Sequence, residues 1–155
     1  MKNNSIDNTD KEILRLLQSD ATLPISEIAE RVSLTTTPCW KRIQRLEQLG
    51  VISKRVVLIE PEELGLNMTV FVMVKTGSHE ANWLNTFSEH ASSIPEVVEF
   101  YRMSGEYDYM LKVVVADMKA FDSFYKRLVA KVNIAEVTSS FAMEQIKYTT
   151  ELPIR

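Results

Sequence analysis

Residues 24–55 constrain the fold of this chain more than any other stretch of the sequence. Their apolar side chains recur at helical spacing, which predicts a helix over 26–32 and a second helix over 35–49. Only Ser33 and Leu34 remain between them, so the link must be tight. Two helices joined in this way present the second helix to the major groove in many DNA-binding proteins. The stretch therefore predicts a helix-turn-helix unit.

The second helix of the pair has recognisable signals at both ends. A threonine hydroxyl within residues 35–37 is expected to cap its start, and Pro38 fits the first turn, where a missing N–H does no harm. Gly50 is expected to end it. Residues 51–59 are rich in β-branched side chains and predict a strand, which would be the wing of a winged helix-turn-helix.

The outer face of the second helix is polar and basic. Residues 35–55 contain five Lys and Arg side chains and one acidic side chain, on a chain with a formal net charge of −3. A helix that reads the major groove needs short polar and basic side chains in its N-terminal half. The residues predicted to contact DNA are Thr35, Thr36, Thr37, Trp40, Lys41, Gln44, Arg45, Lys54 and Arg55. A solvated helical pair fits the same pattern, and spacing and charge alone do not separate the two interpretations.

Two further features belong to the N-terminal half of the chain, another helix and a single cysteine. The helix is predicted over residues 7–20, with Asp7 as its N-cap and Asp10 in the position of a capping box. Cys39 is the only cysteine, so no internal disulfide can form. It lies on the apolar stripe of helix 35–49, which favours a buried core thiol over a redox sensor.

The hydrophobic pattern changes at residue 69, and strands then alternate with helices. The expected elements are strand 69–76, helix 80–91, strand 97–103, strand 108–115, helix 118–132 and strand 135–143, followed by a short edge piece at 146–149. The order β-α-β-β-α-β is that of a ferredoxin-like sandwich, so the fold class is α+β. A boundary near 61–65 divides the chain into a winged helix-turn-helix domain at 1–60 and a ferredoxin-like domain at 61–155.

The predicted sheet also indicates an oligomer. Helices cover one face of such a sheet, and the open face would carry apolar residues from 69–76 and 108–115. An apolar open face usually pairs with another subunit. We therefore expect at least a homodimer, in which two recognition helices read a palindrome with half-sites roughly 10 bp apart.

The turn at 103–109 is a candidate site for a small ligand. Gly105 lets backbone N–H groups approach a carboxylate, and Asp108 can accept from an ammonium group, which together suit an amino acid. The residues expected to form the site are Tyr101, Met103, Ser104, Gly105, Asp108, Tyr109, Thr138, Ser139 and Ser140. A hairpin turn with a capping aspartate explains the turn without a ligand, and is the simpler interpretation on the residues alone.

Short runs spread over both halves of the chain share the pattern of one family. The runs are Ile6-Asp7, Asp10, Ile13-Leu14, Ile28-Ala29-Glu30-Arg31-Val32, Leu34-Thr35-Thr36-Thr37-Pro38-Cys39, Arg42-Ile43, Arg45-Leu46-Glu47, Gly50-Val51-Ile52, Ser104-Gly105 and Asp108-Tyr109. With them, nearly the whole chain resembles the leucine-responsive regulator/asparagine-operon regulator (Lrp/AsnC) family of transcription factors. The chain departs from the family at Thr36, where proline is frequent, and at Ser33, where glycine is common.

The resemblance implies a function. It implies a nucleoid-associated bacterial regulator that binds a palindromic operator in double-stranded DNA and assembles from dimers into an octamer. The single cysteine and the lack of a secretory signal and of a membrane span separately favour the cytoplasm. It also implies that an amino acid binds near the 104–109 turn, at contacts between dimers, and alters operator affinity. The runs 35–42 and 138–150 look most like the branch that regulates cysteine breakdown, which suggests L-cysteine as the effector.

Nothing in the sequence points to catalysis, a metal ion or a membrane. The chain has no P-loop, no G-x-G-x-x-G and no histidines in metal-ligand spacing, and no apolar run of the roughly 18 residues that a membrane span needs. Its polar, acidic start lacks the apolar region of a secretory signal. We expect no enzyme activity, no metal and no cofactor besides the effector. The alternative is a ligand-binding or enzymatic sandwich with a protein-docking appendage, which would place apolar residues on the outer face of helix 35–49.

Overall fold

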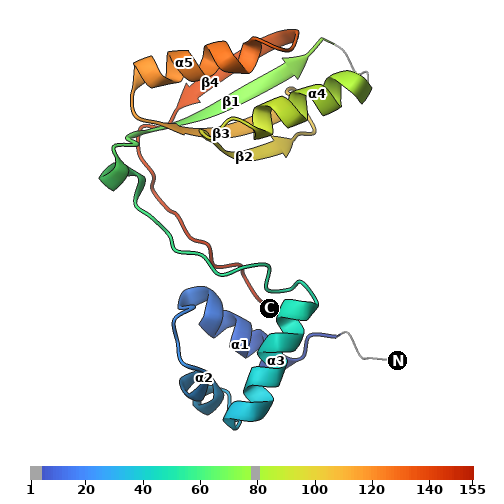
Figure 1. Cartoon of the computed structure of the whole chain (residues 1–155), viewed down its shortest axis with the longest axis vertical. Helices are drawn as coiled ribbons and strands as arrows, with labels where there is room; N and C mark the ends of the chain where they lie inside the picture. Colours follow the sequence, from blue (N-terminus) through green and yellow to red (C-terminus); the bar gives the residue numbers. More distant parts are fainter. Residues whose placement is uncertain (1–4, 78–80) are drawn as a thin grey trace. The chain divides into compact units, whose positions relative to one another are not determined.

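The structure is a computed structural model that describes residues 5–77 and 81–155. The chain forms two units, one with the residues up to Leu58 together with Lys147–Arg155, and one with Ile59–Ile146 (Figure 1). The first break lies close to the boundary expected at residue 61. The end of the chain differs from the expectation, because Lys147–Arg155 belongs to the first unit and not to the ferredoxin-like one.

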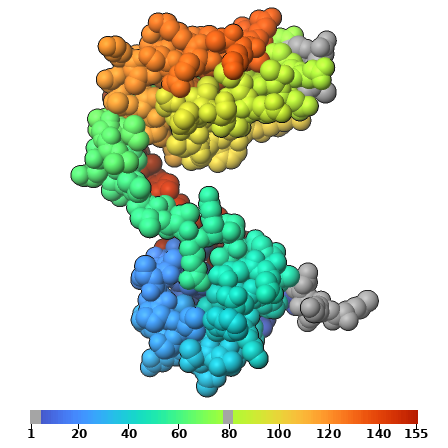
Figure 2. All heavy atoms as spheres, viewed as in Figure 1, coloured from blue at the N-terminus to red at the C-terminus, as the bar shows by residue number. Residues whose placement is uncertain are grey.

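The first unit is built from three helices, α1 (Asn8–Ser19), α2 (Ile25–Arg31) and α3 (Thr36–Gln48). Figure 2 shows their atoms, coloured blue to cyan, as one continuous group. All three lie where the sequence predicts helices. The expected capping box is present at the start of α1, where Asp10 N lies 2.8 Å from Asp7 Oδ1 and Asp7 N lies 3.1 Å from Asp10 Oδ2.

The three helices enclose one apolar core. Its buried members are Ile13, Ile28, Ala29, Val32, Cys39, Ile43 and Leu46. Cys39 has no exposed surface, and burial raises the pKa of its thiol. The prediction of a core cysteine is therefore confirmed, and the thiol lacks the exposure that a reactive cysteine needs.

The link between α2 and α3 contains an unusual backbone conformation. Ser33 has a φ of 57°, in the left-handed region, and Leu34 N donates to Ala29 O at 2.8 Å. An L-residue in this region costs about 1 kcal/mol relative to glycine. The tight turn is kept although serine stands where glycine would fit without strain.

The strand predicted at 51–59 is wrong. Residues 53–60 form neither a helix nor a strand in the described chain, and the same holds for residues 146–149. Several side chains of this linker are apolar and exposed, with Val57 85% exposed. β-Branched composition predicts an extended backbone, whereas a strand also needs a partner for its N–H and C=O groups.

The second unit is a four-stranded antiparallel sheet with two helices on one face. In chain order its elements are β1 (Met68–Thr76), α4 (Ala81–Ser92), β2 (Val97–Arg102), β3 (Tyr109–Val115), α5 (Met118–Val129) and β4 (Ile134–Phe141). The strand order is β2-β3-β1-β4, which confirms the predicted ferredoxin-like sandwich. A short 3-10 helix, η1 (Pro61–Leu64), precedes the sheet. Residue 80 of the predicted helix 80–91 lies outside the described residues.

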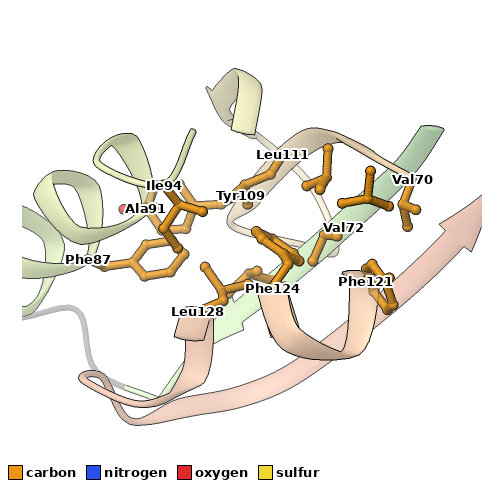
Figure 3. Close-up of a cluster of buried hydrophobic side chains, with 13 residues drawn as sticks. Val70, Val72, Phe87, Ala91, Ile94, Tyr109, Leu111, Phe121, Phe124 and Leu128 are labelled. Carbon is orange, nitrogen blue, oxygen red and sulfur yellow. The ribbon is translucent and has the colours of Figure 1, made fainter. Parts of the chain in front are cut away.

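Alternation along the strands separates the two faces of this sheet. Val72 and its neighbours in β1 at alternate positions are buried under the helices, where Figure 3 shows Phe87 of α4 and Phe124 and Leu128 of α5. The residues between them point to the opposite face and are half-buried, and they include Phe71 and Met73 of β1. The open face therefore carries apolar side chains of β1, as expected.

Candidate nucleic-acid interface and effector site

The first turns of α3 carry the exposed part of the predicted DNA-reading face. Thr36, Thr37, Trp40 and Lys41 are all exposed there. Thr35 occupies the N-cap position, but its side chain makes no capping hydrogen bond, so the predicted hydroxyl cap is wrong. The N-terminal half of α3 thus shows short hydroxyl side chains, one aromatic ring and one cation to its surroundings.

A shallow hollow lies on this face, beside the start of α2. It has a volume of about 230 Å³ and is lined by Ile25 of α2 and by Thr36, Thr37 and Trp40 of α3. Trp40 is 47% exposed. The hollow therefore combines apolar surface with two hydroxyl groups.

The structure gives Arg45 a different environment from the one predicted. Its guanidinium pairs with a carboxylate oxygen of Asp10, whose side chain is fully buried. Arg42 Nη1 lies 2.9 Å from the other oxygen of Asp10 and 2.6 Å from Asp7 Oδ2. A buried carboxylate is tolerated only when it is paired, so these two arginines stabilise the junction of α1 and α3.

This network was missed from the sequence, although a signal exists. Asp7 and Asp10 are three residues apart, and so are Arg42 and Arg45. Equal spacing on two helices that face one another allows both pairs to meet. The neighbouring Arg42 lowers the pKa of the Asp7 carboxyl, and both aspartates raise the pKa of the Arg42 guanidinium.

Glu47 contacts two more of the predicted DNA residues. Gln44 Nε2 lies 3.1 Å from Glu47 Oε2, and Arg55 Nη2 lies 3.2 Å from Glu47 Oε1. These partly exposed contacts are weak, so both side chains can exchange Glu47 for another partner. Lys54 is exposed on the extended linker rather than on a strand.

The predicted ligand turn connects β2 to β3 as a hairpin. Met103 N donates to Asp108 O at 2.7 Å, and Gly105 has a φ of 142°, which favours glycine. Asp108 Oδ2 accepts from Thr76 N at 2.8 Å, and Asp108 N donates to Val74 O at 2.9 Å. The aspartate therefore ties the hairpin to the end of β1, which is the role that needs no ligand.

Tyr109 does not line the turn as predicted. It is only 4% exposed and faces the helices, with ring-centroid distances of 5.3 Å to Phe87 and 5.6 Å to Phe100. Burial raises the pKa of its phenol. Tyr101 remains 47% exposed, and its hydroxyl donates to Glu99 Oε2 at 2.7 Å. Of the two predicted tyrosines, only Tyr101 is accessible to a ligand.

The hydroxyl residues of β4 divide between the two faces of the sheet. Thr138 pairs with Met73 and Ser140 with Phe71, on the open face, whereas Ser139 pairs with the buried Val72. Thr138 and Ser140 thus share one surface, and Ser139 points to the other. The alternation of the strand separates these neighbours in sequence.

Two residues that the sequence did not single out join the turn to β4. Tyr107 Oη lies 3.2 Å from Thr138 Oγ1, and Lys75 Nζ lies 5.0 Å from the centre of the Tyr107 ring. Lys75 also pairs with Glu106 at 3.4 Å and Glu136 at 3.5 Å. The hairpin, the end of β1 and the start of β4 therefore form one polar surface.

Other kinds of site are not formed in the described part of the chain. No group of three or more His, Cys, Asp or Glu residues there could hold a metal ion. None of the helices described is both long and apolar enough to span a membrane.

A helix-turn-helix unit followed by an antiparallel ferredoxin-like sandwich defines a class of two-domain DNA-binding regulators. Two family models match the chain: a winged helix-turn-helix DNA-binding domain over residues 6–53, and the Lrp/AsnC ligand binding domain over residues 69–152. The chain belongs to the Lrp/AsnC family. Its relatives are transcriptional regulators, so the protein is a regulator of transcription and not an enzyme.

Individual relatives agree over nearly the full length. The DNA-binding transcriptional activator DecR of Escherichia coli is 54% identical, over 96% of this chain and 99% of its own. The glutamate uptake regulatory protein of Zymomonas mobilis is 43% identical, over 96% and 91%. An AsnC family regulator of Agrobacterium tumefaciens has 57% identity and a TM-score of 0.92, over 95% and 96%. A Neisseria meningitidis regulator solved with L-methionine has 33% identity and a TM-score of 0.91, over 96% and 97%.

Proposed function

We propose that this protein is an amino-acid-responsive regulator that binds a palindromic operator through α3. The observation that carries the proposal is the exposed set Thr36, Thr37, Trp40 and Lys41 at the start of a recognition helix. Hydroxyl and basic side chains at this place meet base edges and phosphates in the major groove. Gln44, Lys54 and Arg55 lie further along and are proposed to add contacts. Arg45 is proposed to position α3 through Asp10.

The effector is proposed to be an amino acid that binds beside the hairpin at 103–108. Backbone N–H groups around Gly105 suit the carboxylate, and Asp108 suits the ammonium group. Met103, Ser104, Tyr101, Thr138 and Ser140 are proposed to surround the ligand, whereas the buried Tyr109 and the inward-facing Ser139 support it from below. The neisserial relative with bound L-methionine supports the class of ligand. L-Cysteine is the first candidate, on the resemblance to the cysteine-breakdown branch.

The apolar open face of the sheet supports assembly into dimers, and the resemblance supports octamers built from four dimers. The effector is proposed to shift the population of these assemblies and with it the spacing of the two α3 helices. Operator affinity would follow, since a palindrome requires two correctly spaced helices. The protein is proposed to act in the cytoplasm on nucleoid DNA.

Two measurements test this function. The first selects an operator from random DNA and measures its affinity over a range of salt concentrations. Binding should weaken steeply with salt, and Lys41→Ala should lower the log–log slope by about one, whereas Lys131→Ala in the second unit should not. Absent or salt-independent binding contradicts the proposal.

The second measurement is the melting temperature of the protein with each of the twenty amino acids, and at least one of them should raise it.

A further inference from the structure

The hollow between α2 and α3 has a partly apolar lining, which contacts with DNA phosphates do not require. Its lining joins the side chain of Ile25 to the half-exposed indole of Trp40 and to two threonines. Each threonine adds a methyl group as well as a hydroxyl. The hollow lies in the segment that matches the winged helix-turn-helix DNA-binding domain.

We propose that this hollow receives the 5-methyl group of a thymine in the major groove. The inference rests on the proposed operator binding and specifies which base this part of the interface recognises. Among the four bases, only thymine presents an apolar group in the major groove. Cytosine places a hydrogen there, and the purines present polar atoms to the groove.

The dimensions of the hollow suit this occupant. A methyl group is similar in size to a water molecule, which takes about 30 Å³ in the liquid. The hollow of about 230 Å³ therefore admits the methyl group together with the edge of the pyrimidine ring. The hydroxyls of Thr36 and Thr37 then lie beside the polar edges of the same base pair or the next one. Lys41 follows Trp40 in sequence and is exposed, which adds positive charge to the same face.

The test replaces thymine by deoxyuridine, which removes only the methyl group. Each thymine of the selected operator is changed in turn, and the affinity of the unmodified protein is compared by competition. We expect one position in each half-site to lose about fourfold in affinity, the value of one buried methyl group. In Trp40→Ala this penalty should fall to nearly nothing, because the wall of the hollow is gone. Thr37→Ser, which removes a methyl group and keeps the hydroxyl, should reduce it in part.

Lys41→Ala is the matched control. It should weaken binding to thymine and deoxyuridine operators equally and leave the penalty at the sensitive position unchanged. The inference is overturned if no position is sensitive to deoxyuridine, or if Trp40→Ala keeps the full penalty. It is also overturned if Trp40→Ala lowers the affinity for DNA while no replacement of thymine by deoxyuridine does. The indole would then contact a deoxyribose of the DNA backbone and not a thymine methyl group. A chain that enriches no sequence from random DNA overturns the proposed operator binding itself.

Discussion

The side chain of Gln18 and the backbone of Leu152 exchange two hydrogen bonds. Gln18 Nε2 donates to Leu152 O at 2.9 Å, and Leu152 N donates to Gln18 Oε1 at 2.9 Å. Arg15 Nη2 adds a third contact, 3.1 Å from Ile154 O. The end of the chain therefore lies along α1, within the first unit. Both covalent connections between the units, the linker after α3 and the stretch after β4, thus end on the helix-turn-helix unit.

Removing this attachment should loosen α1. Gln18→Ala, or deletion of residues 152–155, is expected to lower the free energy of unfolding of the first unit by about 1 kcal/mol, because the bonds are partly exposed. Hydrogen exchange of the α1 amides measures the effect within that unit. Gln48→Ala, at the exposed end of α3, is the control and should change little. Exchange of the α1 amides in Gln18→Ala and in the deletion protein at the wild-type rate would show that the tail contributes no stability.

Breaking the pair between Arg45 and Asp10 should primarily lower the free energy of unfolding of the first unit. Asp10→Ala leaves two arginines without their shared carboxylate, and we expect a loss of roughly 2 kcal/mol in unfolding free energy, since both cations are partly exposed and regain water. Arg45→Ala should show a smaller loss together with weaker operator binding. Glu12→Ala on the exposed face of α1 should be neutral. An Arg45→Ala protein of unchanged stability would mean that this pair contributes nothing in solution.

The acid sensitivity of the first unit should depend on Arg42. Because Arg42 lowers the pKa of Asp7 below its ordinary value of 3.8, the folded state binds this proton less readily than the unfolded state. The contribution to stability is therefore complete above the ordinary pKa and is lost as the pH falls through the lower, folded-state value. Carboxyl titration by NMR should give a lower pKa for Asp7 in the wild-type protein than in Arg42→Ala. The carboxyl of Glu96, whose pKa is lowered by Arg127 in the second unit, should give the same pKa in both proteins.

Glycine at position 33 should stabilise the link between α2 and α3. Ser33→Gly removes the cost of a left-handed L-residue, and we expect a gain of about 1 kcal/mol, reduced by the greater freedom of glycine in the unfolded chain. Thermal unfolding should show a higher midpoint. Ser26→Gly, placed within helix α2, should lower it instead. A lower midpoint for Ser33→Gly would show that the serine side chain supports the turn.

Asp108 allows its structural and ligand-binding roles to be separated. Asp108→Asn keeps a side-chain oxygen to accept from Thr76 N and removes only the negative charge. We expect this protein to fold and to bind its operator, but to lose the amino-acid-induced rise in melting temperature. Glu62→Gln on η1 should keep that response. A normal response of Asp108→Asn would place the ammonium contact elsewhere.

Much of this molecule follows from short-range patterns in its sequence. The helical spacing around Ile28 and Ile43, the capping pair Asp7 and Asp10, and the alternation in β1 each depend on residues within one or two turns. Such patterns determine the type and order of the elements, because burying one face requires apolar residues at the period of that element. The order of elements, together with the family runs in both halves of the chain, was sufficient to predict the helix-turn-helix unit and the ferredoxin-like sandwich.

Only the tertiary structure decided which distant groups meet. From the sequence, Arg45 is expected to be a surface cation, but in the structure it pairs with Asp10 of α1. Tyr109 is expected to line the ligand site, but in the structure it lies on the buried face of β3, next to Phe87. Residues 51–59 have the β-branched composition of a strand but form none. A strand forms only where a neighbouring strand accepts its backbone hydrogen bonds, whatever the β-propensity of its residues. Helix periods and strand alternation are local properties, whereas ion pairs, ladders and the return of the tail to Gln18 join residues far apart in sequence. Their formation depends on the packing of whole elements, which no local pattern records.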